Sequence, residues 1–332
     1  MNNEEQIDAL RTYFDLMSMN GGARVYRIAR HTGIFDAVGS GSSTPQEVAE
    51  KCGLHEKPVK LLMDTLCSLR TMQVQEDHYA LAPVMEILSR NYQDLSDEYW
   101  DHLPQLLETG VPLARMDDPQ QSEALYTKQV DALAWMMKPS AEVASVILGI
   151  GETRRDLEIL DVGAGSAVWS LTCAQKDPNT RVTAVDWPGI LKIAEASSEK
   201  LGLKDRFRTL PGNYHEVDLP SGFFDLALVG NVTHLETPEG NRALFQKLRR
   251  ALKADGEIAV FDVMPGQELG DLGRALYALG LALRTEKGHV YSKEKLQEFL
   301  RESGFVGSRF SPIEVSPYTM GMILAKNGNG SC

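Results

Sequence analysis

The sequence predicts two domains, a mainly helical N-terminal domain and an α/β domain with a mostly parallel sheet. Strand-like and helical runs alternate from about residue 151 to the end of the chain. Such alternation is typical of a parallel sheet with helices on both faces. The first hundred residues are helical in pattern and contain few strand-like runs. A length of 332 residues also exceeds that of one average domain.

The N-terminal domain, placed at residues 1–100, has the pattern of a winged helix. Thr44 and Glu47 fit a capping box at a helix start, and Pro58 begins a second helix with apolar residues at three- to four-residue spacing. Residues 72–81 have the pattern of two short strands about an acidic turn. Residues 44–72 carry four basic and four acidic side chains, so a positive recognition face is not expected. We predict dimerisation in place of DNA binding.

The α/β domain is expected over residues 151–332, with residues 101–150 as linking helices. Strands are predicted at 158–162, 181–185, 206–210, 224–230 and 257–262. Helices are predicted near 166–176, 189–202, 238–253 and 270–284. A further helix over 292–302 precedes two closing strands at 309–313 and 319–325.

Charge and composition exclude several classes of partner. The net charge of −12 argues against a nucleic-acid or anionic-membrane partner, because phosphate binding requires a positive surface. No apolar run reaches about 18 residues, so no membrane span is expected. The cysteines lack paired spacing, which predicts reduced thiols in a cytoplasmic protein and no metal site. They are Cys52, Cys67, Cys173 and Cys332.

The most informative stretch is the glycine turn after the first strand predicted in the α/β domain. An apolar run ends in Asp161, and Gly163 and Gly165 follow two positions apart. Glycines allow a ligand to approach the backbone closely, and the following helix offers unpaired N–H groups and a positive dipole end. The next strand ends in Asp186, a suitable acceptor for ribose hydroxyls. We therefore expect a ribose-bearing ligand at the carboxyl edge of the sheet.

Two ligands fit a glycine turn of this kind. A dinucleotide site requires a third glycine, but Val168 occupies that position. Asp161 would also lie close to the negative charge of a pyrophosphate. S-adenosylmethionine (SAM) has an ammonium and a sulfonium and no phosphate, so the acidic strand end favours SAM over NAD. The alternatives without a ligand are a plain strand–helix turn at the glycines and a helix N-cap at Asp186.

Two motifs here resemble those of a known family. Residues 161–165, Asp-Val-Gly-Ala-Gly, resemble the first motif of class I SAM-dependent methyltransferases. Residues 186–190, Asp-Trp-Pro-Gly-Ile, resemble the Asp-Leu-Pro-x-Val pattern of small-molecule O-methyltransferases, which include plant phenolic, acetylserotonin-type and bacterial tailoring enzymes. The resemblance covers nearly the whole chain and implies a Rossmann-like domain, a winged-helix dimerisation domain, a homodimer and a role in secondary metabolism.

The resemblance also implies a set of cofactor-binding residues. They are Asp161, Gly163, Gly165, Asp186, Trp187, Asn213, Tyr214, Asn231 and Ser140. Residues 212–214, Gly-Asn-Tyr, match the family's Gly-Asp-Met/Phe, in which the second residue meets the adenine amine and the third covers the ring. Asparagine replaces aspartate here, and its carbonyl can still accept a hydrogen bond. For Asn213 the alternative is an ordinary turn residue, and for Tyr214 it is core packing. Met136 and Ser140 match the family's Met-x-x-x-Ser pattern.

His234 is the candidate catalytic residue. It follows the strand predicted at 224–230, and ligands bind beyond the carboxyl ends of such strands. A neutral histidine can take a hydroxyl proton as the oxygen attacks, which is the role of the matching histidine in the resembled family. The alternative is a loop histidine that caps the helix beginning near Pro238.

The region around His234 departs from the plant-type pattern. Plant members hold the histidine with two glutamates. Asp262 is a candidate substitute for the first, and nothing obvious in residues 288–291 substitutes for the second. The family's tryptophan two positions after the histidine is Glu236 here.

A small-molecule acceptor is expected between the domains, lined by the 126–148 helix and residues 264–284. The candidate lining residues are Trp135, Met136, Met137, Met264 and Tyr277, with core packing as the alternative for each. The sequence thus predicts a SAM-dependent methyltransferase acting on a hydroxyl of a small hydrophobic, aromatic molecule. C- or N-methylation, a SAM-binding lyase or pericyclic enzyme, a regulator and a non-catalytic scaffold are the alternatives.

Overall fold

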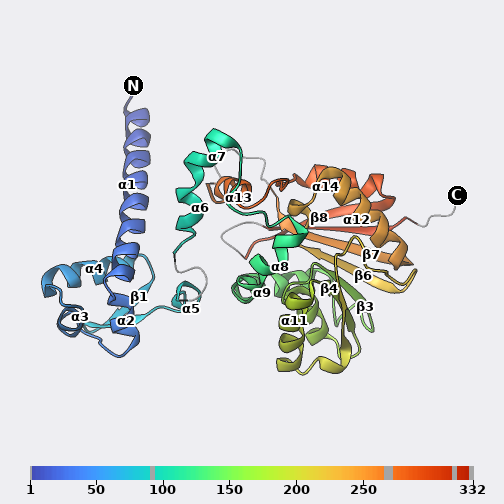
Figure 1. The fold of residues 1–332 in the computed structure, drawn as a ribbon, viewed down its shortest axis with the longest axis horizontal. Coiled ribbons are helices and arrows are strands. Elements are labelled where there is room, and N and C mark those ends of the chain that lie inside the picture. Colours follow the sequence, from blue (N-terminus) through green and yellow to red (C-terminus); the bar gives the residue numbers. More distant parts are fainter. Residues whose placement is uncertain (1, 90–93, 265–271, 316–319, 329–332) are drawn as a thin grey trace. The chain divides into compact units, whose positions relative to one another are not determined.

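The computed structural model describes residues 2–89, 94–264, 272–315 and 320–328, which are drawn in colour in Figure 1. The chain forms two compact units, Met1–Ser96 and Asp97–Cys332. Cys332 lies outside the described residues, whereas Cys52, Cys67 and Cys173 are free thiols. No helix among the described residues has the length and apolar character needed to cross a membrane.

The first unit consists of helices and one short hairpin. Its elements are α1 (Asn3–His31), α2 (Ile34–Gly39), α3 (Pro45–Cys52), α4 (Glu56–Ser68), β1 (Met72–Gln75), β2 (His78–Leu81) and α5 (Met85–Leu88). Thr44 and Glu47 form the predicted capping box at the start of α3. The two strands pair antiparallel across the acidic turn. The helices and hairpin predicted from the sequence are therefore present, and they enclose a core that includes Tyr26, Val48 and Met63.

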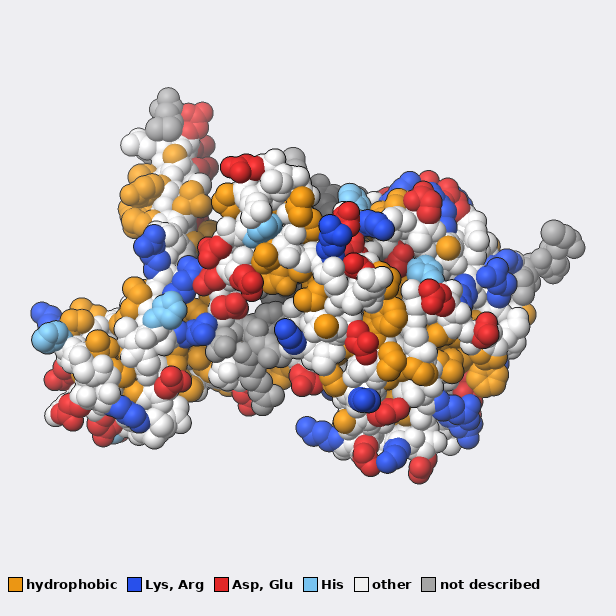
Figure 2. All heavy atoms as spheres, in the orientation of Figure 1, with side chains coloured by type: hydrophobic (Ala, Val, Ile, Leu, Met, Phe, Trp, Pro, Cys, Tyr) orange, Lys and Arg blue, Asp and Glu red, His pale blue; other side chains and the backbone are white. Residues whose placement is uncertain are grey.

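Helix α1 carries apolar side chains that the unit does not bury. The large apolar side chains that are at least 43% exposed on its N-terminal half are Ile7, Leu10, Tyr13, Phe14, Leu16, Met17 and Met19. Figure 2 shows apolar side chains gathered along this helix. Unpaired apolar stripes of this kind are typical of an interaction surface.

The second unit contains a seven-stranded sheet of order β5-β4-β3-β6-β7-β9-β8. The five parallel strands are β3 (Glu158–Val162), β4 (Arg181–Asp186), β5 (Phe207–Pro211), β6 (Phe224–Gly230) and β7 (Leu252–Val263). β9 (Met320–Asn327) pairs antiparallel with both β7 and β8 (Phe305–Ile313). The strand at 257–262 begins earlier than predicted, because Leu252 already pairs with Phe224 across an irregular step in the register.

Helices cover both faces of the sheet (Figure 1). The helices of this unit are α6 (Asp97–Asp101), α7 (Leu103–Thr109), α8 (Pro119–Thr127), α9 (Val130–Ile147), α10 (Val168–Lys176), α11 (Pro188–Lys200), α12 (Pro238–Ala251), α13 (Leu272–Ala282) and α14 (Lys293–Glu302). Side chains alternate along each strand, so Ile159 packs with α9, α10 and α11, and Leu160 packs with α12 and α14. Both cores are apolar, as the continuous apolar runs of the strands predict.

The parallel register brings the carboxyl ends of the central strands to one edge of the sheet. Val162 pairs with Val185 on one side and with Val229 on the other, and Gly230 pairs with Phe261. The chain therefore leaves β3, β4, β6 and β7 at neighbouring points. We call this the carboxyl edge.

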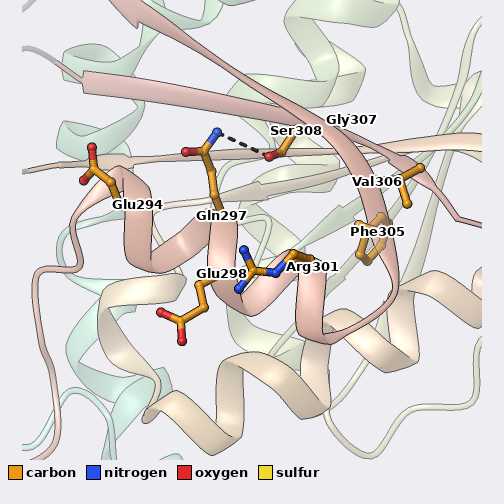
Figure 3. A pocket seen from close by; sticks show the side chains of 8 residues that line it. All are labelled: Glu294, Gln297, Glu298, Arg301, Phe305, Val306, Gly307 and Ser308. Carbon is orange, nitrogen blue, oxygen red and sulfur yellow. Dashed lines mark hydrogen bonds between the residues drawn. The ribbon is translucent and has the colours of Figure 1, made fainter.

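A cavity of about 520 Å³ lies elsewhere, between α14 and β8 (Figure 3). It is lined by Glu294, Gln297, Glu298, Arg301, Phe305, Val306, Gly307 and Ser308. β8 enters the sheet at Phe305, which pairs with Asn327, and the adjoining Lys326 pairs with Glu257 in the first half of β7. The cavity is therefore closer to the amino ends of the parallel strands than to the carboxyl edge.

We predict that Gly230→Ala destabilises the second unit. A Cβ at this position would lie 2.5 Å from Nε1 of Trp169, and that indole is buried and stacked on Phe261 with ring centroids 4.4 Å apart. Forcing atoms into such a site costs about 1–3 kcal/mol. Urea unfolding followed by circular dichroism measures the loss.

Gly280→Ala is the control, because it lies within α13 and the nearest atom that its Cβ would meet is 3.9 Å away. It is predicted to leave stability unchanged or raise it by up to about 1 kcal/mol. Equal unfolding midpoints for the two variants would contradict the close packing at Gly230.

Candidate active site

The glycine loop joins β3 to α10 and is tied to the end of β4. Gly163 and Gly165 have φ angles of +61° and +58°, which glycine adopts without strain. The N–H groups of Gly163 and Ala164 both donate to the carbonyl of Val185, at 2.9 and 3.2 Å. A Cβ on Gly163 would lie 2.6 Å from Cγ2 of Val232. The structure thus shows a close approach of Val232 to the loop at Gly163, and the predicted approach of a ligand stays a prediction.

Asp161 is a buried carboxylate in β3, just before this loop. Its side chain is 1% exposed and accepts a hydrogen bond from the Ser170 hydroxyl of α10. Burial raises the pKa of Asp161 to about 7, and the nearby Asp186 carboxylate adds to the rise. Because Asp161 is enclosed, water screens its charge only weakly. When ionised, the carboxylate therefore exerts a strong electrostatic effect on the neighbouring loop.

Asp186 is the second carboxylate of the carboxyl edge. It ends β4, and its Oδ2 and Oδ1 accept hydrogen bonds from the N–H groups of Gly165 and Trp187, both at 2.7 Å. Burial raises the pKa of Asp186 to about 6 despite these two donors. Among the described residues, neither Asp161 nor Asp186 forms an ion pair with Lys or Arg. The edge therefore holds two desolvated acidic groups without a cation.

Helix α8 packs beside this edge, a feature that the sequence did not indicate. The Trp187 indole Nε1 donates to the Ser122 hydroxyl at 3.2 Å. The N–H of Gly189, in the first turn of α11, donates to the Glu123 carboxylate. Trp187 therefore uses its indole to hold α8, and the start of α11 is already capped by a carboxylate from another helix.

Asn213 and Tyr214 lie on the turn after β5. Oδ1 of Asn213 accepts a hydrogen bond from the N–H of His215 at 2.9 Å, so this side chain stabilises its own turn. The Tyr214 hydroxyl donates to Oε1 of Glu236 at 2.6 Å. Cε1 of Tyr214 lies 3.9 Å from the position of a Cβ on Gly163. The structure thus brings Tyr214 to the glycine loop, as the family motif implies.

His234 lies in a short 3-10 turn, η2 (Thr233–Leu235), and is 6% exposed. Its Nδ1 lies 2.8 Å from Oδ1 of Asp262, the buried second-to-last residue of β7. The other carboxylate oxygen, Oδ2, accepts hydrogen bonds from the His234 N–H and the Thr233 hydroxyl. With Nδ1–H donating to Asp262, Nε2 is the proton acceptor of the neutral ring. The sequence named Asp262 only as a substitute for a family glutamate.

Tyr277 of α13 faces the imidazole of His234 edge to face. The ring centroids are 5.8 Å apart, and the hydroxyl lies 3.4 Å from Nε2 and 3.5 Å from Nδ1. These distances are long for an O–H···N hydrogen bond. The phenol is therefore beside the imidazole without being bound tightly to it. On the backbone side, the N–H of His289 donates to the carbonyl of His234 at 2.8 Å.

The remaining site residues predicted from the sequence do not gather at one place. Asn231 has a φ of +58°, and its N–H donates to the Phe261 carbonyl at 2.8 Å, which turns the chain after β6. Ser140 is buried in α9, and its hydroxyl has no hydrogen-bond partner among the described residues. Trp135 of the same helix is 49% exposed.

The three predicted methionines differ in burial. Met136 and Met137 are half-buried on α9. Met264 is buried with the β-sheet core, close to Gly321 of β9. The described residues contain no group of three metal-ligating side chains. The structure thus gathers the glycine loop, both aspartates and Tyr214 at one edge, and places His234 with Tyr277, but does not assemble the whole predicted lining.

Comparisons with known proteins match this architecture. The family described as a methyltransferase domain matches residues 159–256. The L-tyrosine C(3)-methyltransferase of Streptomyces lavendulae is 29% identical over 63% of this chain and 56% of its own length. The 3-hydroxy-5-methyl-1-naphthoate 3-O-methyltransferase of Streptomyces sahachiroi is 22% identical over 83% of this chain and 84% of its own. The matched methyltransferase domain and these relatives support the class I SAM-dependent O-methyltransferase family for this chain.

A solved structure shows the same fold for this methyltransferase over its whole length. Human N-acetylserotonin methyltransferase in complex with SAM superposes with a TM-score of 0.74 and 18% identity. The alignment covers 99% of this chain and 100% of the human chain. The predicted fold class, a helical N-terminal part followed by an α/β part with a mostly parallel sheet, is therefore confirmed.

The carboxyl edge of this methyltransferase fits SAM. The edge offers two carboxylates whose pKa values are raised by burial, and no basic side chain among the described residues pairs with them; this suits a cation and disfavours a pyrophosphate. Gly163 and Gly165 have no side chains that could block a ligand at these two loop positions. When bound, SAM supplies a methyl group on a positively charged sulfur.

We predict that the affinity for SAM rises between about pH 5 and pH 8. The pKa values of Asp161 and Asp186, raised by burial to about 7 and about 6, mean that both groups hold protons in the free protein below those values. A cation favours the ionised carboxylates, so binding at low pH must release protons and is weakened by up to about tenfold per pH unit for each proton released. Calorimetry in two buffers of different ionisation enthalpy measures the affinity and the protons released.

Asp161→Asn is the matched variant, because the amide keeps the shape and removes the titration. It should lose the part of the pH dependence that lies near pH 7. An affinity that is constant from pH 5 to pH 8, or that rises as the pH falls, would contradict the assignment of a cation to this edge.

Proposed function

We propose that this methyltransferase transfers a methyl group from SAM to a hydroxyl of a small hydrophobic, aromatic molecule, with His234 as the general base. The observation that carries the proposal is the buried contact between His234 and Asp262 at the same sheet edge as the glycine loop. The N–H of Val263 also donates to Oδ1 of Asp262, at 2.8 Å, so this carboxylate has four donors in all. A histidine that served only as a helix cap would not require such a buried carboxylate.

Deprotonation of the acceptor is the step that His234 assists. A phenol has a pKa near 10, so ionising it at pH 7 costs about 4 kcal/mol. Asp262 holds Nδ1–H and thereby directs Nε2 to accept the hydroxyl proton. The carboxylate also stabilises the imidazolium that forms, which is the role of the acidic partner in other histidine pairs. A positioned base of this kind contributes about 10²–10⁴-fold.

This chain lacks the second glutamate that holds the histidine in the plant-type pattern. Contacts between main-chain atoms hold the His234 turn at this place instead. The N–H of His289 donates to the His234 carbonyl, and a Cβ on Gly288 would lie 3.1 Å from that same oxygen. The segment therefore packs tightly against the histidine turn, and a side chain at Gly288 would crowd this oxygen as well as the side chain of Thr285. We infer that main-chain contacts position His234 here, so that one carboxylate is sufficient.

C-methylation is a second candidate, because one similar protein is an L-tyrosine C(3)-methyltransferase. Removing a phenolic proton raises electron density on the oxygen and on the neighbouring ring carbons. The same base therefore serves both reactions, and the orientation of the acceptor decides which atom is methylated. NMR of the product identifies the methylated atom.

We predict that His234→Ala lowers the single-turnover rate of methyl transfer to a phenol by about 10²–10⁴-fold, while SAM binding is retained. Asp262→Asn should also lower the rate, because an amide cannot stabilise the imidazolium. Mass spectrometry of a panel of phenols measures the methylated product and S-adenosylhomocysteine together.

His55→Ala is the control, because His55 is exposed in the first unit and its side chain makes no capping hydrogen bond. An unchanged rate in His234→Ala would refute the general-base role. Absence of both products from the wild-type enzyme with every phenol would favour the non-methylating alternative.

We further propose that α1 forms a homodimer interface. Leu10, Phe14 and Met17 follow the spacing of one helical face and are each about half exposed. A second copy of this face would bury them, as apolar stripes of helices require. The winged-helix unit would then serve association of two chains.

Replacing Leu10, Phe14 and Met17 together with serine is predicted to convert a dimer into a 36.7 kDa monomer. Light scattering after size-exclusion chromatography measures the mass. Leu107→Ser is the control, because Leu107 is 76% exposed on α7. A wild-type mass equal to that of one chain would rule the interface out.

A further inference from the structure

Glu236 forms a polar cluster beside the glycine loop to which the proposed reaction gives no role. Its Oε1 accepts a hydrogen bond from the Tyr214 hydroxyl at 2.6 Å and lies 3.0 Å from Nε2 of His215. The Glu236 side chain is 16% exposed and that of His215 is 29% exposed. Both partners belong to the turn after β5, whereas Glu236 follows β6. The carboxylate therefore joins two loops of the carboxyl edge.

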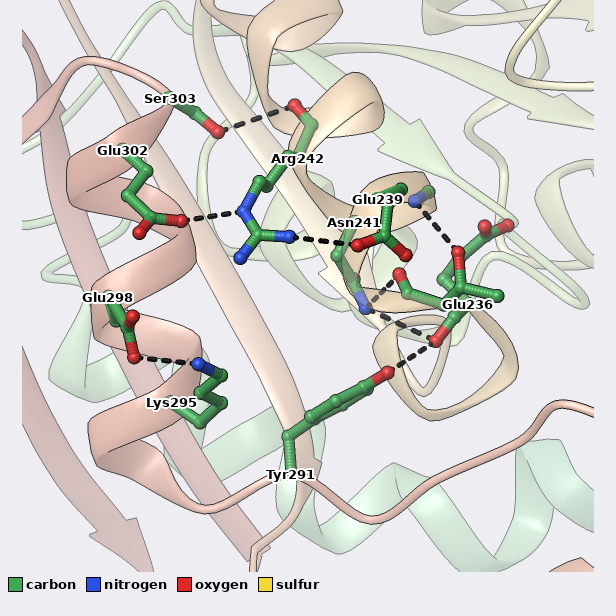
Figure 4. Close-up of polar contacts among 11 residues, drawn as sticks. Glu236, Glu239, Asn241, Arg242, Tyr291, Lys295, Glu298, Glu302 and Ser303 are labelled. Atoms are coloured by element: carbon green, nitrogen blue, oxygen red, sulfur yellow. Dashed lines mark hydrogen bonds and ion pairs between the residues drawn. The ribbon is translucent and has the colours of Figure 1, made fainter.

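The backbone of Glu236 is fixed on its other side, as Figure 4 shows. Its carbonyl accepts a hydrogen bond from the Tyr291 hydroxyl at 2.8 Å. Nδ2 of the fully buried Asn241 donates to the Thr233 carbonyl at 3.0 Å and contacts the carbonyls of Glu236 and Thr237. The turn cannot shift without breaking these bonds. The main chain of Glu236 is therefore held in place, and with it the starting point of the side chain that carries the carboxylate.

The charge states of Glu236 and Tyr214 determine which group donates the hydrogen bond between them. The bonds from His215 and Tyr214 outweigh desolvation and lower the pKa of Glu236, so it is ionised at neutral pH. Burial, together with the Glu236 charge, raises the pKa of Tyr214 well above its usual value, so the phenol keeps its proton. The bond is therefore a charge-assisted O–H···O⁻ bond, which is stronger than a neutral one.

The ring that this bond holds lies against the glycine loop. Cε1 of Tyr214 is 3.9 Å from the position of a Cβ on Gly163, and Val232 fills the remaining space. Asp186 contributes to the electrostatic environment of the phenol. Rotation of the ring away from the loop would deprive the partly buried Glu236 carboxylate of the donor that forms its shorter hydrogen bond, which is costly.

We propose that Glu236 is a positioning residue whose carboxylate holds the Tyr214 ring over the glycine loop and so shapes the site for the nucleoside of SAM. The proposal rests on SAM binding at this edge. Two positions at which this chain departs from the family motifs then complement each other, one as donor and the other as acceptor. Where the family has Met or Phe, this chain has a hydroxyl at Tyr214, and where the family has Trp, it has the matching acceptor at Glu236.

Calorimetric titration of SAM into the full-length protein tests this role. Glu236→Ala is expected to raise the Kd about tenfold or more, because a charge-assisted buried bond is lost. Glu236→Gln should stay within about threefold of the wild type, since its carbonyl still accepts from Tyr214. Tyr214→Phe should weaken binding, and the double variant should be no weaker than the worse single variant, because the two residues act through one bond.

Glu239→Ala is the matched control, since Glu239 is close in sequence and its side chain is 82% exposed. Thermal unfolding of each variant separates binding from stability. An unchanged Kd in a destabilised Glu236→Ala protein would show a merely structural role and overturn the proposal, and so would additive losses in the double variant. Failure of the wild type itself to bind SAM would instead overturn the function on which the proposal rests.

Discussion

The site depends on two carboxylates, the buried Asp161 and the partly buried Asp186, which form no ion pair with Lys or Arg in the part of the chain that the structure describes. Asp161 and Asp186 end neighbouring parallel strands, and burial raises the pKa of each. An uncompensated buried charge is among the least favourable features that a fold can carry. Its persistence at the strand ends of this sheet is best explained by a ligand that supplies positive charge. The family identification and the choice of SAM over NAD both agree with that requirement.

The same sheet geometry unites the remaining parts of the site. β6 lies between β3 and β7, so the turn with His234, which follows β6, leaves the sheet next to Asp262 of β7 and near the glycine loop that follows β3. Hydrogen bonds from the side chains of Asn241 and Tyr291 to backbone carbonyls hold this turn, and Glu236 lies near its end. One short segment, residues 233–237, therefore connects the proposed base to the residue that orients Tyr214. Under the two proposals made above, this one turn positions both the base and the Tyr214 ring at the cofactor site.

Much of the fold could be predicted from the sequence, because strand and helix periods are local properties. The strand at 224–230 and the glycine turn were predicted at the observed positions. Contacts between distant segments could not be predicted: Glu123 capping α11, Trp169 stacking on Phe261 and Glu236 meeting Tyr214 depend on tertiary packing. Asp262 was visible as a polar strand end, but its four donors were not. The roles of Ser140, Trp135 and Met264, and the cytoplasmic location, stay predictions.

The most direct test of the central claim is a pair of crystal structures, one from a crystal soaked with SAM and one from a crystal soaked with NAD. We expect the first to show adenosine density beside Asp186 and Tyr214, and the second to show no pyrophosphate on the glycine loop. A pyrophosphate resting over Gly163 and Gly165, or SAM bound away from the two carboxylates, would contradict the account.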